Sequence, residues 1–233
     1  MPPLSALLEL VLPTRCVGCG SPIAALCPLC MPAGELVRLS GAPPTVAAAP
    51  YADAVRAALI AYKERGRRDL ARPLGALLTR AVLGTLGGSD AERAPPRRTV
   101  LVPVPSARAV AAARGGDHVA RLARRVARAT GLRTAPDVLV LARAVRDSAG
   151  LGSAERRTNL SGAMVARLPP PDLAAVLVDD IVTTGATLGE ARRALVSAGW
   201  PVVGAAVVAA TPRQHRRVGA PIGSPHVSGL AWG

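Results

Sequence analysis

The chain has 233 residues, half of them apolar, and its 29 Lys and Arg against 15 Asp and Glu give a formal net charge of +14. This apolar content excludes an intrinsically disordered chain, and no apolar stretch reaches the ~20 residues of a membrane-spanning helix. All basic residues except Lys63 are Arg. The charge therefore has two open explanations, a polyanionic partner or the codon bias of a genome rich in G and C.

The start of the chain does not have the pattern of a secretory signal peptide. Its first ten residues carry no positive side chain, and Pro13 and Arg15 end the apolar run over 4–12. We therefore expect a cytoplasmic, reducing environment. The spacing of the apolar residues in this run predicts a short amphipathic helix, which either docks on the rest of the protein or contacts a membrane surface or partner.

All four cysteines lie within residues 16–30, in two CxxC pairs separated by seven residues. Two such pairs can present four thiolates to one tetrahedral ion, with each sulfur ~2.3 Å from zinc. Two disulfides or four free thiols are the alternatives, and a reducing compartment disfavours the disulfides. A site with four protein ligands is closed, so we expect a structural zinc ion. Its ligands would be Cys16, Cys19, Cys27 and Cys30.

Beyond the cysteines, the pattern becomes an alternation of strands and helices. Residues 40–50 are rich in Pro and Ala and predict a linker or an irregular crossing. Periodicity predicts helices over 53–66, 70–83, 107–129 and 187–198, and strands over 99–104, 137–142, 174–178 and 202–209. Strands separated by helices at this spacing indicate an α/β fold with a parallel sheet. The Gly/Pro-rich tail from residue 219 has little to bury.

The most informative stretch is residues 176–187, VLVDDIVTTGAT, in which an apolar strand ends in Asp179 and Asp180. A Thr/Gly loop follows and opens a helix. The N–H groups of such a loop and helix N-terminus can hold a phosphate, and Gly185 permits close approach of the backbone. Two carboxylates would repel that phosphate but suit ribose hydroxyls or a metal, at the sheet edge where α/β proteins bind ligands. The ligand implied is a ribose phosphate.

This stretch resembles the fingerprint of the type I phosphoribosyltransferases, in which an apolar strand and two acids precede a TTGxT-type loop. The resemblance implies that Asp179 and Asp180 are catalytic and bind the ribose hydroxyls of phosphoribosyl pyrophosphate (PRPP), with magnesium bridging pyrophosphate and ribose oxygens. It also implies a pyrophosphate loop after the strand at residues 102–105. The implied PRPP-binding set is Val104, Pro105, Asp179, Asp180, Ile181, Val182, Thr183, Thr184, Gly185, Ala186 and Thr187.

The chain as a whole resembles the ComF family, phosphoribosyltransferase-like proteins associated with DNA uptake in natural competence. The resemblance spans residues 4–210 and rests on the order of short motifs: the cysteine pairs, Tyr62-Lys63 with Gly66-Arg67, VPVP at 102–105, Arg114-Gly115, Glu155-Arg156 with Asn159-Leu160, and residues 178–187. The chain departs from the family where RGFNQ is usual, because it has RGGDH at 114–118.

The ComF resemblance implies a type I phosphoribosyltransferase-like parallel sheet flanked by helices, preceded by a small zinc module. We expect residues 1–35 to form the N-terminal helix and zinc module, 36–218 the phosphoribosyltransferase-like domain and 219–233 a loose tail. The implied activity is magnesium-dependent transfer of ribose 5-phosphate from PRPP to an acceptor that the sequence does not define. Three alternatives stay open: a single-stranded DNA-binding protein, an adaptor for competence-machinery proteins, and a PRPP-sensing regulator.

Several basic residues are candidates for contacts with phosphate. On the predicted helix, Arg114, His118, Arg121, Arg125 and Arg128 would share one stripe. That stripe is either a solvated face, a surface that tracks the phosphates of single-stranded DNA, or part of the pyrophosphate pocket. A lone helical His is more often structural.

The remaining basic candidates are Lys63, Arg143 and Arg156. Lys63 either reaches a phosphate or the acceptor, or is a solvated helix residue. Arg143 precedes residues 147–162 and Arg156 lies within them, and this segment either closes over pyrophosphate or forms a plain surface loop.

Overall fold

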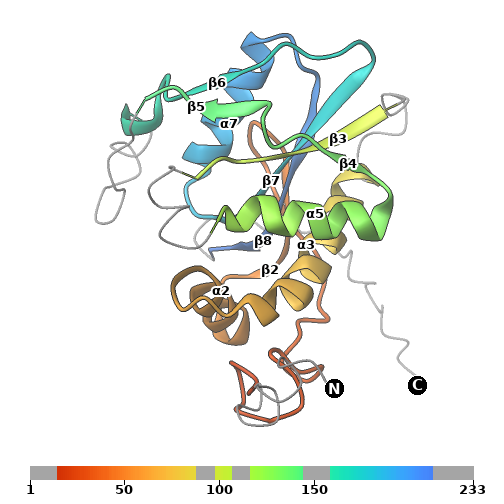
Figure 1. The fold of residues 1–233 in the computed structure, drawn as a ribbon, viewed down its shortest axis with the longest axis vertical. Coiled ribbons are helices and arrows are strands. Elements are labelled where there is room, and N and C mark those ends of the chain that lie inside the picture. Colours follow the sequence, from red (N-terminus) through yellow and green to blue (C-terminus); the bar gives the residue numbers. More distant parts are fainter. Residues whose placement is uncertain (1–14, 88–97, 107–115, 144–157, 212–233) are drawn as a thin grey trace, which may run out of the picture.

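The computed structural model describes residues 15–87, 98–106, 116–143 and 158–211. Its centre is a six-stranded sheet in the order β1-β2-β8-β7-β3-β4 (Figure 1). These strands are β1 (Val37–Leu39), β2 (Thr45–Pro50), β3 (Arg98–Pro103), β4 (Arg133–Thr134), β7 (Leu173–Val182) and β8 (Val202–Ala210). Every neighbouring pair is parallel except β1 with β2.

Helices cover both faces of this sheet (Figure 1). One face carries α2 (Asp53–Glu64), the short 3-10 helix η1 (Arg68–Leu70), α3 (Ala71–Leu86) and α5 (His118–Thr130). The other face carries α7 (Ala186–Ser197) and a two-stranded antiparallel sheet of β5 (Leu139–Leu141) and β6 (Met164–Ala166). The predicted α/β class, with a mostly parallel sheet flanked by helices, is confirmed.

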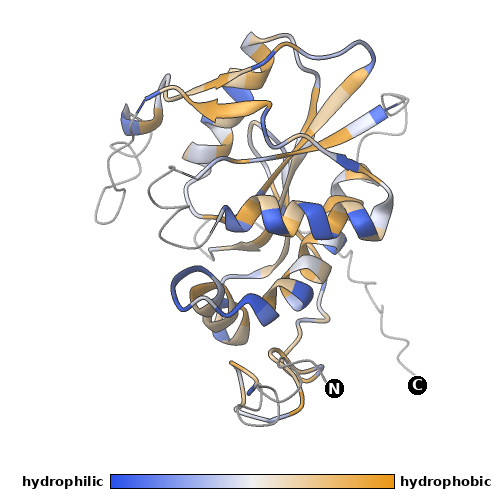
Figure 2. Ribbon diagram, in the orientation of Figure 1, coloured by the Kyte–Doolittle hydropathy of each residue, from blue (hydrophilic) through white to orange (hydrophobic). Residues whose placement is uncertain are grey.

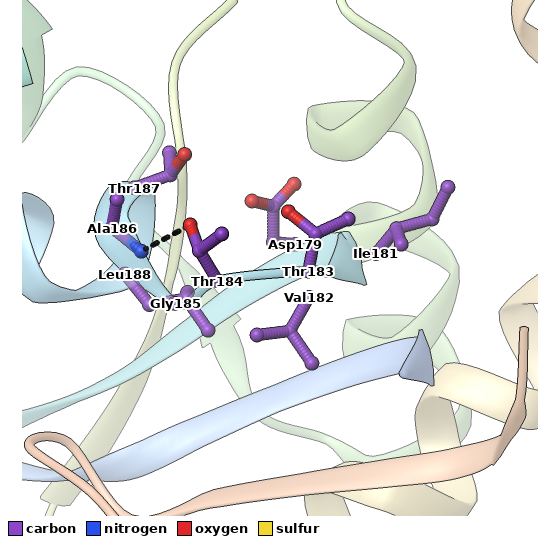
Figure 3. Close-up of a pocket in the computed structure, with 9 residues that line it drawn as sticks. All are labelled: Asp179, Ile181, Val182, Thr183, Thr184, Gly185, Ala186, Thr187 and Leu188. Atoms are coloured by element: carbon purple, nitrogen blue, oxygen red, sulfur yellow. Dashed lines mark hydrogen bonds between the residues drawn. The ribbon is translucent and has the colours of Figure 1, made fainter. Parts of the chain in front are cut away.

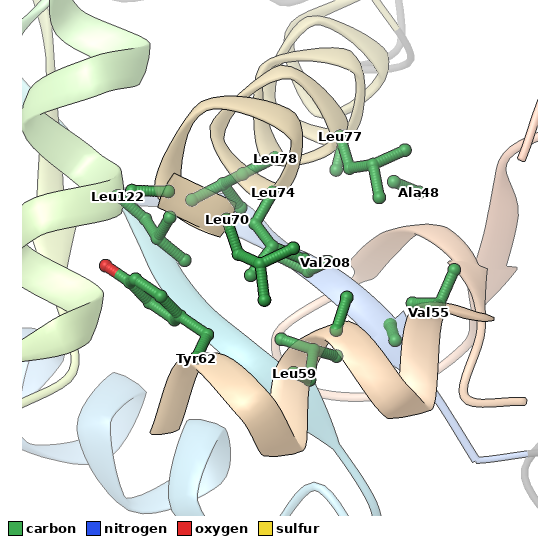
Figure 4. Packing of buried hydrophobic residues seen from close by; sticks show 14 of the residues in the cluster. Ala48, Val55, Leu59, Tyr62, Leu70, Leu74, Leu77, Leu78, Leu122 and Val208 are labelled. Carbon is green, nitrogen blue, oxygen red and sulfur yellow. The ribbon is translucent and has the colours of Figure 1, made fainter. Parts of the chain in front are cut away.

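The two faces have separate apolar cores, and β7 contributes to both. Val176 and Val178 pack into the cluster that contains the buried residues of α2, α3 and α5. Ala175 and Leu177 pack into the cluster that contains the buried face of α7. This alternation follows from the two-residue period of a strand, and burial on both faces explains why the strand reads as a continuous apolar run. Figure 4 shows the first cluster, where leucines of α3 meet α2, α5 and β8.

The predicted linker over residues 40–50 is wrong for its second half, because residues 45–50 form β2. This strand is parallel to β8 in the middle of the sheet, and its first five residues are buried. Pro43 and Pro44 precede the strand and Pro50 ends it, so no proline interrupts its interior. The composition of the whole stretch obscured a short run, TVAAA, whose small side chains fit beneath α3.

The predicted helix over 107–129 is also wrong in its extent, because α5 begins only at His118. Gly116 has a positive φ of 117°, and Asp117 has extended backbone and caps the helix by accepting hydrogen bonds from the N–H groups of Val119 and Ala120. Gly131 in the left-handed conformation follows its end. The helix is strongly two-sided, with Arg on one side and apolar residues on the other (Figure 2). Of the expected stripe, His118, Arg121, Arg125 and Arg128 lie on α5, and Arg114 lies outside the described residues.

The predicted strand over 137–142 exists in part, as β5, but it does not join the main sheet. It pairs antiparallel with β6, and the short strand β4 occupies the edge beside β3 instead. The expected N-terminal helix over 4–12 and the tail from residue 219 lie outside the described residues, as do Arg114 and Arg156.

An ion pair between buried Glu190 and exposed Arg193 fastens the two-stranded sheet to α7. The Glu190 carboxylate accepts a hydrogen bond from Met164 N at 3.0 Å, and Arg193 donates both to Glu190 and to the Met164 carbonyl, each at 2.8 Å. The two side chains thus satisfy the outer edge of β6 as a neighbouring strand would. The pKa of Glu190, which burial would raise, is lowered by Arg193 and the Met164 N–H.

We expect Glu190→Ala to lower the free energy of unfolding by about 1–3 kcal/mol, because it leaves the buried Met164 N–H without an acceptor. Glu190→Gln keeps an acceptor and should lose less. Urea unfolding measures the stability, and hydrogen exchange of the Met164 amide measures the local effect. Unchanged protection of that amide in Glu190→Ala would contradict the proposed contribution of Glu190 to the edge of β6.

Candidate functional site

The carboxyl end of β7, the loop after it and the start of α7 border a small hollow that is open to solvent. It is lined by Asp179, Ile181, Val182, Thr183, Thr184, Gly185, Ala186, Thr187 and Leu188 (Figure 3). The hydroxyls of three threonines and the Asp179 carboxylate point to the same side of the loop, whereas Val182 points away from them. The expected loop residues are therefore gathered around one hollow.

Gly185 gives the loop its shape. It is the N-cap of α7 and has a φ of 75°, a left-handed conformation that favours glycine. The Thr184 hydroxyl accepts a hydrogen bond from Ala186 N at 3.3 Å, which fixes the turn into the helix (Figure 3). The first turn of α7 has no acidic residue. The positive end of the helix dipole thus faces the hollow without a protein carboxylate in that turn to compete with an anion.

The segment after β3 lies beside this end of β7. Pro103 is in register with Val178, and the backbone N–H of Val104 donates to the Val178 carbonyl at 2.9 Å. Val104 and Pro105 are therefore next to the acid pair, as expected from two neighbouring parallel strands. Asp117 ties the same segment to α5, because its carboxylate accepts a hydrogen bond from Ser106 N at 3.2 Å.

The two acids of β7 lie on opposite faces of the sheet. Asp179 continues the row of Ala175 and Leu177, which faces α7, and lines the hollow. Asp180 continues the row of Val176 and Val178, which faces α2, α3 and α5, and is not among the residues that line the hollow.

Asp180 is the centre of a buried polar network. Its Oδ2 atom lies 2.6 Å from Lys63 Nζ, which comes from the last turn of α2. The same oxygen lies 2.8 Å from Nε2 of His118, the first residue of α5. The Tyr62 hydroxyl donates to the His118 carbonyl at 3.3 Å, and Figure 4 shows this hydroxyl directed at α5. Residues 62, 63, 118 and 180 are thus joined across three elements.

These surroundings push the pKa values of the two acids apart. Burial raises the pKa of Asp179 well above its usual value, and the charge of Asp180 raises it further. Burial alone would also raise the pKa of Asp180, but the His118 hydrogen bond and the Lys63 charge hold it well below its usual value. Asp180 is therefore held in its carboxylate form, whereas burial and Asp180 outweigh the opposing charge of Lys63 at Asp179.

Other basic candidates have different places. Arg143 donates hydrogen bonds to the carbonyls of Asn159 and Ser161 at 2.8 and 2.9 Å, so it joins the two chain segments next to β5 and β6. Lys63, expected either at a phosphate or in solvent, is instead paired with Asp180, and 24% of its side chain is exposed. The involvement of His118 was not expected. The alternation of β7 indicates that Asp180 enters a core where a carboxylate needs donors, but it does not identify Lys63 or His118 as those donors.

The four cysteines lie close together near the first turn of α2. Their sulfurs all lie within 4.8 Å of one another, and Cys19 Sγ is 3.6 Å from Cys27 Sγ. Four sulfurs in a tetrahedron around zinc, each ~2.3 Å from the ion, are about 3.8 Å apart, so this group fits such an ion. Burial would raise the pKa of the Cys16 thiol, but backbone hydrogen bonds with Cys19, Cys27 and Gly18 lower it to about 6. The cluster can therefore hold zinc.

None of the helices within the described residues combines the length and apolar character needed to cross a bilayer.

The part of the chain around the hollow resembles a known protein family. Residues 111–222 match the family model of the phosphoribosyl transferase domain. The matched segment includes α5, β7, the Thr/Gly loop and α7, and it supports a phosphoribosyltransferase-like protein that binds PRPP. It leaves out Lys63 and the cysteine cluster. A search of curated proteins found no match.

The acid pair should show opposite effects on stability. Asp179→Asn keeps an acceptor for the backbone N–H of Asp180, which donates to Asp179 Oδ1 at 2.8 Å, and removes a buried charge. We expect it to raise the free energy of unfolding at pH 7 by about 1 kcal/mol. Asp180→Asn removes the carboxylate that pairs with Lys63 and His118 and should lower the free energy of unfolding by about 3 kcal/mol.

Asp179 and Asp180 should also have opposite effects on how the free energy of unfolding changes with pH. A raised pKa in the folded state means that Asp179 increases stability as the pH falls from 7, and a lowered pKa means that Asp180 decreases it below about pH 4. Asp179→Asn should remove only the first effect. Urea unfolding between pH 3 and 8 measures both, and a shift of the two variants in the same direction at pH 7 would contradict the assignment.

Proposed function

We propose that the protein binds PRPP at the end of β7 and transfers ribose 5-phosphate from it to an acceptor. The observation that carries this proposal is the hollow in which a helix N-terminus, three threonine hydroxyls and the Asp179 carboxylate converge. A ligand with both a phosphate and sugar hydroxyls matches these groups. The phosphate suits the helix N-terminus and the threonine hydroxyls, and the sugar hydroxyls suit the carboxylate. The match of residues 111–222 to the phosphoribosyl transferase domain supports the same ligand.

The loop residues Thr183–Thr187 hold the 5′-phosphate in this proposal, through backbone N–H groups and hydroxyls. Asp179 accepts a hydrogen bond from the ribose, and Val104 and Pro105 lie on the pyrophosphate side. The bond from ribose C1 to the pyrophosphate oxygen breaks and a bond from C1 to the acceptor forms. Magnesium bound with PRPP would balance the charge of the pyrophosphate leaving group. The protein's own contribution is orientation and charge placement.

The four cysteines hold a structural zinc ion in our proposal. Their module is packed directly on α2, because a Cβ added at Gly18 would lie 2.8 Å from Ala54 Cβ and 2.7 Å from Cys30 Sγ. Cys16, Leu26 and Cys27 also belong to the same apolar cluster as Val55 and Leu59 of α2. We retain residues 1–35 as the zinc module, 36–218 as the phosphoribosyltransferase-like domain and 219–233 as a tail.

We further propose membership of the ComF family, with a cytoplasmic role in DNA uptake beside competence-machinery proteins. The combination of the cysteine module with a phosphoribosyl transferase domain supports this. The protein would act in this role as a PRPP-sensing regulator if it binds PRPP without converting it.

A second candidate function, binding of single-stranded DNA, is favoured by the surface of α5. Arg124, Arg125 and Arg128 are exposed, and α5 contains no acidic residue. Gly75 of α3 leaves room for the stem of Arg125, since a Cβ there would lie 3.1 Å from it. Such a surface would bind mainly by charge, so the affinity would fall steeply with salt.

Calorimetric titration with PRPP and magnesium tests the proposed function, and Gly185→Ala is the most direct variant. Alanine in the left-handed conformation costs about 1–2 kcal/mol, so straightening of the loop should weaken PRPP binding about tenfold. Gly199→Ala is the matched control, because Gly199 has a φ of 90° just past the other end of α7. It should lose similar stability but keep the affinity.

Absence of PRPP binding by a folded, zinc-loaded protein would contradict the proposed function. Salt-dependent binding of a single-stranded oligonucleotide by that protein would then favour the second candidate.

The zinc site has its own test. We expect about one zinc ion per chain by elemental analysis, and loss of that ion in the double variant Cys16→Ser with Cys19→Ser, because two of four thiolate ligands are removed. Chelation should unfold the cysteine module before the sheet, as seen by hydrogen exchange. An unchanged zinc content in the double variant would rule out this site.

A further inference from the structure

We propose that Arg67 and Arg80 are positioning residues of the cysteine cluster: they hold the two ends of the cysteine module and thereby raise its affinity for zinc. This inference rests on the proposed zinc site and adds to it two residues from outside the module. The module lies beside α2 (Figure 1), and both arginines come from the layer that α2 and α3 form.

The first observation is a hydrogen bond at the start of the module. Arg67, the residue before η1, donates from Nη2 to the backbone carbonyl of Arg15 at 3.1 Å. Arg15 directly precedes Cys16, the first of the four cysteines, and Cys16 is buried. The carbonyl that Arg67 holds therefore belongs to the residue next to a proposed metal ligand.

A carboxylate fixes the direction of this guanidinium. Asp69 accepts hydrogen bonds from Arg67 Nε at 3.0 Å and from Arg67 Nη2 at 2.7 Å. This two-point contact orients the planar fork of the arginine, and Nη2 still has a second N–H group for the Arg15 carbonyl. Burial would raise the pKa of Asp69, but the hydrogen bond and the charge of Arg67 lower it. The pair is therefore ionised at neutral pH.

The second observation is a similar contact at the end of the module. Arg80 of α3 donates from Nη1 to the Pro32 carbonyl at 2.7 Å and from Nη2 to the Gly34 carbonyl at 2.6 Å. Pro32 lies two residues after Cys30, the last of the four cysteines. Arginines from the α2–α3 layer thus hold the backbone on both sides of the cysteine-containing segment.

The module gains from this support because it has no regular structure of its own. Residues 15–36 form turns but neither helix nor strand. Bringing four thiolates together in such a segment costs conformational entropy. Contacts that already hold both ends of the segment lower this cost, so the metal is bound more tightly. Partners beyond the ligands themselves commonly change metal affinity by ~10–100-fold.

The chain offers controls that separate these hydrogen bonds from charge alone. A zinc ion with four thiolates has a net negative charge, so any nearby arginine is attracted to it. Arg68 directly follows Arg67, and Arg72 lies on α3 as Arg80 does. Both control arginines carry the same charge and are exposed. Neither has a hydrogen bond to the module among those of the described residues.

Competition with a chromophoric zinc chelator measures the zinc affinity of the full chain and its variants. We expect Arg67→Met and Arg80→Met each to weaken zinc binding about tenfold. The double variant should lose about a hundredfold, because the two contacts lie at opposite ends of the segment and act independently. Arg68→Met and Arg72→Met should keep the affinity within about twofold, since exposed charges contribute little.

The absorption spectrum of the protein loaded with Co²⁺ separates positioning from the loss of a ligand. All four cysteines are retained in these variants, so the bands of tetrahedral thiolate coordination should be unchanged at saturation. Should Arg67→Met fail to fold, Asp69→Asn keeps the arginine but removes the charge that orients its fork. That variant should weaken zinc binding several-fold.

An unchanged zinc affinity in Arg67→Met or in Arg80→Met would overturn the role of that arginine. An equal loss in Arg68→Met and Arg72→Met would overturn the proposal, because charge rather than hydrogen bonding would then be responsible. A changed Co²⁺ spectrum at saturation would also overturn it, since the ligands themselves would differ. Absence of zinc binding by the wild-type protein would instead refute the proposed zinc site.

Discussion

Two adjacent carboxylates at the buried end of a central strand are the constraint on which the site depends. Because successive side chains of β7 face opposite layers, the acids cannot share one environment. Asp180 enters the core beneath α2 and α5 and needs cationic or hydrogen-bonding partners there, which Lys63 and His118 provide. Asp179 faces the phosphate loop and lines the hollow. The raised pKa of Asp179 and the lowered pKa of Asp180 express this difference.

Helix α7 connects the hollow to the rest of its layer. Its N-terminus forms the loop around Gly185, and its next turns carry Glu190 and Arg193, which bind the edge of β6. One short helix therefore determines both the shape of the anion-binding loop and the location of the two-stranded sheet. On the opposite face of the sheet, α2 also makes a contact at each of its ends. Its first turn packs against the cysteine module, and its last turn carries Lys63, which pairs with Asp180.

The sequence predicted those parts of the fold that are encoded locally. The apolar run of β7, the acid pair, the Thr/Gly loop and the paired cysteines each follow from a short pattern. Strand β2 was missed because prolines at its flanks dominated the composition of the stretch. The late start of α5 was missed as well, although Gly116 before an Asp N-cap is a local signal for it. The partners of Asp180 were out of reach for another reason: they lie 62 and 117 residues away along the chain, and no periodicity encodes such contacts.

The central claim is that a ribose phosphate binds between the Thr/Gly loop and Asp179. A crystal structure of the zinc-loaded protein with PRPP and magnesium tests it most directly. The account predicts the 5′-phosphate on residues 183–187 and a ribose hydroxyl on the Asp179 carboxylate. Density for PRPP elsewhere would contradict it.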